Sequence, residues 1–502
     1  MTDDRSNGVA GPGWADNRDK RINGLFPLAV ERFLNRSVAE ALPGVTTVTT
    51  VARSWAVHSM VIAHCAEAGM DEEARRQLLR RVEIVVAVAS IAHMEDRSHF
   101  TWMPKPHGHD RVAHFLESGP ISLDEVSTDG SGYSEAKWGF LTPYLGSETR
   151  FGFVSRDASE PGAEYDPDRV ESNLKPLIAL AQQDQISLDD VAVFPRLCIC
   201  GAALCDDGEW LAEHLTGSNP HGRLAVASPQ AAAMGLIVEA MRHAPITGAN
   251  DVTDFIRFHP RIQESPLLEA ARVQRWRGLA LRQSAVKAWR QMWSQMSEWA
   301  ANEGGFIEES RLADQLADRA PNQKVREFVD SLPPSTNSKG PLNAETDFSN
   351  EVEPALATLG AILLSGRRSS ELHGEQLAGF AGATPDQLEE LSPHWVARET
   401  DHWASQPMAD FCRALVRTLL ARSQRVALAK AQWNKLGEYV VPGRVLLREG
   451  LVEWRDREPA GDPPLRIAEL MSIGHQLRMF EVDEAGLWYL AERGERLAGH
   501  LL

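Results

Sequence analysis

Apolar residues recur at helical spacing through one unusually long stretch of this chain, residues 265–302. They follow one another at steps of three, four and seven, which is the pattern of one buried face of a helix. A helix of this length extends over about 55 Å, which is longer than most helices of globular proteins. The sequence therefore predicts a helical spine or a coiled-coil arm. The apolar positions are Trp276, Leu279, Val286, Trp289, Trp293, Met296 and Ala300.

The same stretch is strongly basic, although the chain as a whole has a net charge of −18. Residues 271–297 contain Arg and Lys but no Asp or Glu, and residues 411–437 repeat this composition. Two basic helices in an acidic chain indicate contact with an anionic surface, which is either double-stranded DNA, a partner protein, or acidic groups of the same chain. The expected binding residues are Arg275, Arg282, Arg290, Arg417, Arg422, Arg425 and Lys430.

Length and composition favour a multi-domain protein of the cytoplasm. A chain of 502 residues exceeds one ordinary core, and a hydrophobic content of 43% is sufficient for a core in each domain. The first residues lack the apolar segment of a signal peptide, and no apolar run is long enough to span a bilayer. Five cysteines in a chain of this length do not indicate a disulfide framework.

The order of patterns along the chain predicts a mainly α-helical fold with a small α+β module at the C-terminus. The clearest linker, residues 331–350, contains two consecutive prolines and few large apolar residues. Short β-type runs near residues 439–447 and 480–490, with a helix between them, resemble a winged-helix module. We expect a disordered tail (1–23), an N-terminal helical domain with a small β or loop insertion (24–185), a central helical domain (186–330), the linker (331–350), a C-terminal helical domain (351–437) and the winged-helix-like module (438–502).

One set of residues has the side chains that bind zinc. Cys198, Cys200 and Cys205 lie close together in the sequence, and His214 follows nine residues later. Thiolates and imidazole are the usual zinc ligands, but structural zinc sites commonly place two residues between paired cysteines, whereas only one lies between Cys198 and Cys200. The apolar neighbours of these cysteines are equally typical of buried free thiols.

Histidines are concentrated in residues 93–114. A metal-dependent hydrolase or nuclease needs three or four converging ligands and a metal-bound water, and zinc or manganese would serve. Polar loop composition is the alternative explanation. The histidines of this cluster are His93, His99, His107, His109 and His114.

Several common catalytic motifs are absent. The chain has no Gly-x4-Gly-Lys-[Ser/Thr] phosphate loop, no Gly-x-Gly-x-x-Gly dinucleotide motif, no Gly-x-Ser-x-Gly and no His-Glu-x-x-His. Nucleotide binding, serine hydrolysis of the α/β-hydrolase kind and zincin chemistry are therefore not expected.

Near the N-terminus, Pro43-Gly44-Val45-Thr46-Thr47 is followed by Ala52-Arg53 and Trp55. This pattern resembles the opening of uncharacterised helical proteins that are associated with bacterial anti-phage defence gene clusters. The resemblance covers about the first tenth of the chain, and it implies a component of a multi-gene defence system without implying catalytic residues.

Together, these observations predict a non-catalytic scaffold or adaptor subunit that binds partner proteins and, through its two basic helices, DNA. The alternative is a metal-dependent hydrolase that uses either the histidine cluster or the cysteine set.

Overall fold

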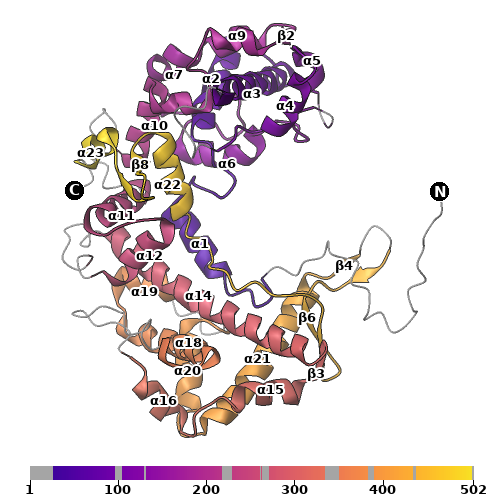
Figure 1. The fold of residues 1–502 in the computed structure, drawn as a ribbon, viewed down its shortest axis with the longest axis vertical. Coiled ribbons are helices and arrows are strands. Elements are labelled where there is room, and N and C mark those ends of the chain that lie inside the picture. The colour runs from indigo at the N-terminus through magenta and orange to yellow at the C-terminus, as the bar shows by residue number, and fades with distance from the viewer. Residues whose placement is uncertain are drawn as a thin grey trace. The chain divides into compact units, whose positions relative to one another are not determined.

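The computed structural model describes residues 26–95, 104–128, 130, 132–217, 229–259, 262, 271–333, 350–382, 389–433 and 437–499. Their fold is mainly helical with a few small antiparallel sheets (Figure 1). The predicted tail (1–23) and most of the predicted linker lie outside these residues.

The chain divides into two compact units that each combine distant parts of the sequence. Unit 1 consists mainly of residues 274–465, and unit 2 consists mainly of residues 38–256 and 466–502. This division differs from the predicted order of domains, because the last part of the chain joins the unit built from its first half.

Unit 2 is a layered helical body in which α2 and α3 pack against each other. Its short β1–β2 and β8–β9 pairs are both antiparallel. Its helices are α2 (Arg53–Glu67), α3 (Glu72–Glu95), α4 (His109–Leu116), α5 (Leu123–Val126), α6 (Leu141–Phe151), α7 (Pro167–Leu174), α8 (Pro176–Ala181), α9 (Leu188–Ala192), the 3-10 helix η1 (Ile199–Ala203), α10 (Asp206–Thr216), α11 (Pro229–His243), most of α12 (Ala249–Phe258), α22 (Ile467–Gln476) and α23 (Glu492–Ala498). Its strands are β1 (Ile121–Ser122), β2 (Gln185–Ile186), β8 (Phe480–Val482) and β9 (Trp488–Leu490).

Unit 1 contains the long helix and a three-stranded sheet with strand order β3-β7-β6. α1 (Arg32–Ala41) begins in this unit. The other helices are α14 (Ala271–Asn302), α15 (Glu309–Ala317), α16 (Val325–Ser331), α18 (Pro354–Glu371), α19 (Gly374–Ala381), α20 (Pro393–His402) and α21 (Met408–Ala429). The strands are β3 (Phe306–Glu308), β4 (Gln432–Trp433), β5 (Tyr439–Val440), β6 (Val445–Arg448) and β7 (Leu451–Trp454).

The predicted long helix is confirmed over the described part of its range. α14 runs from Ala271 to Asn302, and the tryptophans that defined its apolar face are each at most 3% exposed. Burial of aromatic side chains of this size supplies much of the free energy that holds a helix in a core. The tryptophans are Trp276, Trp289 and Trp293.

The mainly helical fold class is confirmed, whereas the strands near the C-terminus do not form one module. β6 pairs with β7, and β7 also pairs with β3 from residues 306–308. β8 and β9 pair only with each other among the described strands, and they belong to unit 2. The described strands of residues 438–502 therefore belong to three separate sheets, since β5 pairs with β4. The pairing of β7 with β3 could not be read from a local pattern.

No helix within the described residues combines the length and the apolar composition that crossing a membrane requires.

Two glycines allow α14 and α19 to cross at backbone contact. A Cβ atom on Gly278 would lie 2.2 Å from the carbonyl oxygen of Gln376, and a Cβ atom on Gly379 would lie 2.3 Å from the carbonyl oxygen of Arg275. Both obstructing atoms belong to the backbone, so a methyl group at either position would force the two helices apart.

We therefore expect Gly278→Ala to lower the free energy of unfolding by about 2 kcal/mol, within the range for overpacked cores. The measurement is denaturant unfolding followed by circular dichroism. Gly146→Ala in α6 is the matched control, because a Cβ atom on Gly146 would have no neighbour within 4 Å. That substitution should be neutral or stabilising by up to about 1 kcal/mol. Equal stability of the Gly278→Ala variant and the unmodified protein would contradict this account of the crossing.

Candidate metal centre

Three metal-binding side chains converge where the end of α3 meets the segment that precedes α10. His93 lies in the last turn of α3, and Cys198 and Cys200 lie at the start of η1. The Cys198 and Cys200 sulfurs are 2.7 Å apart. The Nδ1 atom of His93 lies 2.8 Å from the Cys200 sulfur and 3.2 Å from the Cys198 sulfur. Among the described residues, this is the one group of three or more such side chains with all ligand atoms within 4.8 Å of one another.

Hydrogen bonds from α3 fix the backbone of the cysteine segment. The Ser90 hydroxyl accepts a hydrogen bond from the Ile199 amide at 3.1 Å and donates one to the Val86 carbonyl at 2.7 Å. Ser90 and His93 are three residues apart, so both side chains point toward the same side of the helix. α3 therefore binds the segment at two places, through Ser90 at the backbone and through His93 at the sulfurs.

A buried arginine on α2 supports the same segment from within. Arg53 is 1% exposed and makes a two-fold contact with Asp207 of α10, at 2.8 Å from Nε to Oδ2 and 3.0 Å from Nη2 to Oδ1. Its Nη1 atom donates to the carbonyl oxygens of Arg196 and Cys198. The Cβ position of Gly201 lies 2.0 Å from this Nη1 atom, so only glycine fits there. The guanidinium group thus holds the turn in the shape that brings the two sulfurs together.

The two thiols differ in acidity. The hydrogen bond from Cys200 lowers the pKa of Cys198 despite burial, with further help from His93 and Arg53. The hydrogen bond to Cys198, together with burial, raises the pKa of Cys200. Without a metal, such a pair is expected to consist of one thiolate and one thiol. A divalent cation displaces the remaining proton, so that both sulfurs become thiolates.

The geometry of these atoms fits a zinc ion after a small adjustment. A tetrahedral zinc ion with bonds of about 2.3 Å to sulfur holds two sulfur ligands about 3.7 Å apart. The sulfurs at 2.7 Å must therefore separate by about 1 Å, which side-chain rotation can supply. The position at the C-terminal end of α3 also favours a cation, because the helix dipole is negative there.

The remaining members of the predicted cysteine set lie apart from this group. Cys205 is buried beside Arg53, and its sulfur is outside the converging set. His214 packs against Phe151 and Phe153 with ring centroids at 5.7 and 4.7 Å, and burial lowers its pKa to about 4. The observed set therefore retains Cys198 and Cys200 and replaces Cys205 and His214 with His93.

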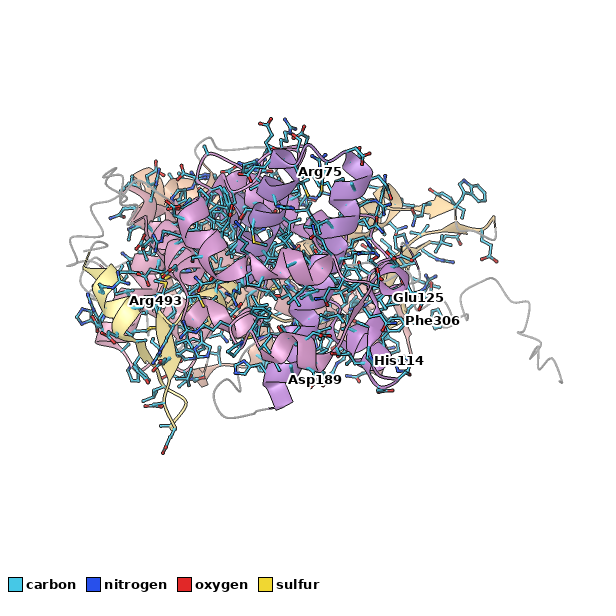
Figure 2. The ribbon with its side chains drawn as sticks, turned by 90° about the horizontal axis from the view of Figure 1, so that it is seen from above. Arg75, His114, Glu125, Asp189, Phe306 and Arg493 are labelled. Atoms are coloured by element: carbon cyan, nitrogen blue, oxygen red, sulfur yellow. The ribbon has the colours of Figure 1, made fainter. Side chains whose placement is uncertain are left out.

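The predicted histidine cluster is dispersed, apart from the contribution of His93. His107 bonds Tyr144 at 2.8 Å through Nε2, and burial lowers its pKa to about 4. His109 contacts Asp110 at 3.0 Å, and the exposed His114, labelled in Figure 2, contacts Glu117 at 3.2 Å. His99 lies outside the described residues. The sequence identified His93, but it grouped this residue with its neighbours instead of with cysteines more than 100 positions away.

A second buried polar cluster in unit 2 lies behind a surface pocket of about 510 Å³. The Nδ1 atom of His58 lies 2.6 Å from Glu148, and its Nε2 atom lies 3.0 Å from Glu83. Burial raises the pKa of Glu148, whereas the nearby His58 lowers it. With both glutamates ionised, the carboxylates accept, both ring nitrogens donate, and the ring is an imidazolium. Burial alone would lower the pKa of His58, but Glu148 and then Glu83 raise it to about 10. The Tyr133 hydroxyl, on the wall of the pocket, donates to Glu83.

The three predicted binding residues of α14 are buried or half-buried in unit 1. Arg282 is 4% exposed and lies over the Phe33 ring at 5.3 Å, and burial lowers its pKa to about 10. Arg290 lies 3.7 Å from Glu31. Arg275 is half-buried beside the crossing with α19. Arg282 and Arg290 therefore contact groups of unit 1.

The basic residues of α21 are largely matched by groups of the same unit. Arg422 and Arg425 both contact Glu390. Arg417 lies 4.0 Å from Glu309 with about half of its side chain exposed, and Lys430 donates to the carbonyl oxygen of Phe26 at 3.3 Å. Charge segregation along the sequence is thus largely balanced in space, although Arg417 and Arg425 keep exposed surface.

No known protein-family model, curated protein or solved structure matches this chain.

We expect the His58 cluster to make stability depend on pH. The folded-state pKa of about 10 is above the ordinary value of 6.5, so the stabilisation is complete below about pH 6.5 and is lost as pH rises toward 10. The free energy of unfolding should therefore fall between about pH 7 and 10. His58→Gln should be less stable at neutral pH and should show a smaller decline. Unfolding curves with the same pH dependence for both proteins would contradict the imidazolium.

Proposed function

We propose that this protein is a helical scaffold whose unit 2 is stabilised by a zinc ion bound to His93, Cys198 and Cys200. The observation that carries the proposal is the convergence of one imidazole nitrogen and two sulfurs from two distant segments. Zinc is the first choice because thiolate and imidazole ligands suit its borderline-soft character, whereas manganese prefers oxygen ligands.

Burial of the sulfurs supports a structural role for the metal. Cys198 is 2% and Cys200 is 8% exposed, so a large substrate has little access to the sulfur side of the site. The ion would bond the end of α3 to the segment that Arg53 and Ser90 already hold. Metal binding of this kind adds directly to the free energy of folding.

The partners of this scaffold are proposed to be other protein subunits of a bacterial complex. The N-terminal resemblance to proteins of anti-phage defence clusters supports this choice. DNA is a weaker proposal, because Arg422 and Arg425 share Glu390 and Arg282 is buried. Phosphates would have to compete with these internal contacts, which reduces the net gain from binding.

A metal-dependent hydrolase is the second candidate function, and one observation favours it. The converging group supplies three ligands, and catalytic zinc sites commonly have three protein ligands with water in the fourth position. A water bound there would be activated for attack at neutral pH.

Zinc content tests the principal proposal. We expect about one zinc ion per chain in protein purified under reducing conditions, as measured by elemental analysis. Cys198→Ser and His93→Ala should each lower zinc affinity by more than the 10–100-fold that is typical of changes around the ligands. Zinc should also raise the thermal unfolding midpoint of the unmodified protein.

Cys205→Ser is the matched control, because Cys205 belongs to the predicted set but not to the converging group. This variant should bind zinc as tightly as the unmodified protein. A metal-free protein that binds no added zinc would refute the proposal, and equal losses from Cys205→Ser and Cys198→Ser would show that the ligands are wrongly assigned.

Cobalt substitution separates the scaffold from the hydrolase. With Co²⁺ in place of zinc, a structural site requires a fourth, non-exchangeable ligand in addition to His93, Cys198 and Cys200, and it should therefore give a tetrahedral absorption spectrum that added cyanide leaves unchanged. A spectrum that shifts with cyanide would show an open position and favour the hydrolase.

A further inference from the structure

We propose that oxidation by hydrogen peroxide joins Cys198 to Cys200 in a disulfide bond and thereby releases the metal from His93. This inference rests on the proposed zinc site and describes its regulation. It requires that the two sulfurs can either bind zinc or form a disulfide bond without rearrangement of the surrounding helices.

The sulfur–sulfur distance lies between the distances that the two states need. At 2.7 Å, the sulfurs are about 0.6 Å farther apart than in a disulfide bond, for which the separation is about 2.05 Å. They are about 1 Å closer than two sulfur ligands of a tetrahedral zinc ion. Small rotations of two side chains therefore lead to either state.

The surrounding structure keeps this pair together when no metal is bound. Arg53 holds the Cys198 carbonyl, and Ser90 holds the Ile199 amide between the two cysteines. Both contacts are made through the backbone or through other side chains, so neither depends on a metal–sulfur bond. The sulfurs thus stay within reach of each other after the ion leaves.

The other described cysteines lack a comparable neighbour. Cys65, Cys205 and Cys412 are buried and free, and none belongs to the converging group. Hydrogen peroxide is small and neutral, so it is the oxidant expected to reach these largely buried sulfurs. Reversible oxidation should therefore concentrate at Cys198 and Cys200.

The chemistry balances in two steps. One thiolate sulfur attacks an oxygen of hydrogen peroxide, the O–O bond breaks, and a sulfenic acid and hydroxide form. The second zinc-bound sulfur, as thiolate, attacks the sulfenic sulfur, so that the S–S bond forms and hydroxide leaves and takes up a proton from solvent. The two sulfurs of the disulfide are no longer thiolate ligands, so the zinc ion dissociates. A dithiol reductant returns both hydrogens and restores the site.

The test treats zinc-loaded full-length protein with hydrogen peroxide and follows three quantities. A chromogenic chelator measures released zinc, intact mass detects the loss of two hydrogen atoms, and peptide mapping locates the linked cysteines. We expect one zinc ion released for each Cys198–Cys200 disulfide formed, with rebinding after dithiothreitol and added zinc. Cys205→Ser, the matched control, should behave as the unmodified protein.

The outcomes separate this inference from the zinc proposal. Zinc that binds but is released without a Cys198–Cys200 disulfide, or is not released at all, would overturn the inference and leave the zinc site intact. Failure of the reduced protein to bind zinc would overturn both. Cys200→Ser provides a second check, because any residual zinc that it binds should not be released reversibly by peroxide and dithiothreitol.

Discussion

The buried ion pair between Arg53 and Asp207 is the interaction on which the candidate site depends. Removing a guanidinium group from water is costly unless its donors are satisfied, and Arg53 directs them to a carboxylate and to two carbonyl oxygens. This requirement fixes the cysteine segment relative to α2 and α10. The close approach of the two sulfurs is then a consequence of satisfying a buried charge, and a metal adds to an arrangement that already exists.

In unit 1, too, charged side chains are paired within the fold, and there the pairing involves whole helices. The acid-free stretches of the sequence become α14 and α21, and the carboxylates that accompany them come from other elements, such as Glu31 and Glu390. Separation of charge along the chain can therefore reflect pairing across space as readily as a binding surface. Only the positions of the acidic partners, which are not local in sequence, distinguish the two explanations.

Local patterns predicted what depends on neighbours along the chain, and they missed what depends on distant ones. Helical spacing located α14, and the short β-type run near residues 480–490 located the β8–β9 pair. The sheet in which β3 joins β7 was not predictable, since more than 140 residues separate these strands. The predicted set of metal ligands was incomplete for the same reason. The sequence analysis identified His93 and the cysteines as separate candidates. Their convergence depends on Arg53, which the sequence analysis named only as part of the N-terminal resemblance.

α3 explains why these features occur together in unit 2. Most residues of α3 between Leu78 and Ile91 are apolar, yet Arg80, Glu83, Ser90 and His93 follow one side of the helix. Arg80 donates hydrogen bonds to the carbonyl oxygens of Ser127, Thr128, Ser134 and Ala136. Glu83 contacts His58 and accepts a hydrogen bond from Tyr133, and Ser90 and His93 contact the cysteine segment. A shift of this helix by one residue would break all three sets of contacts and leave buried polar groups unpaired, at a cost of several kcal/mol. The polar stripe therefore sets the register of α3, and that register places His93 over the sulfurs.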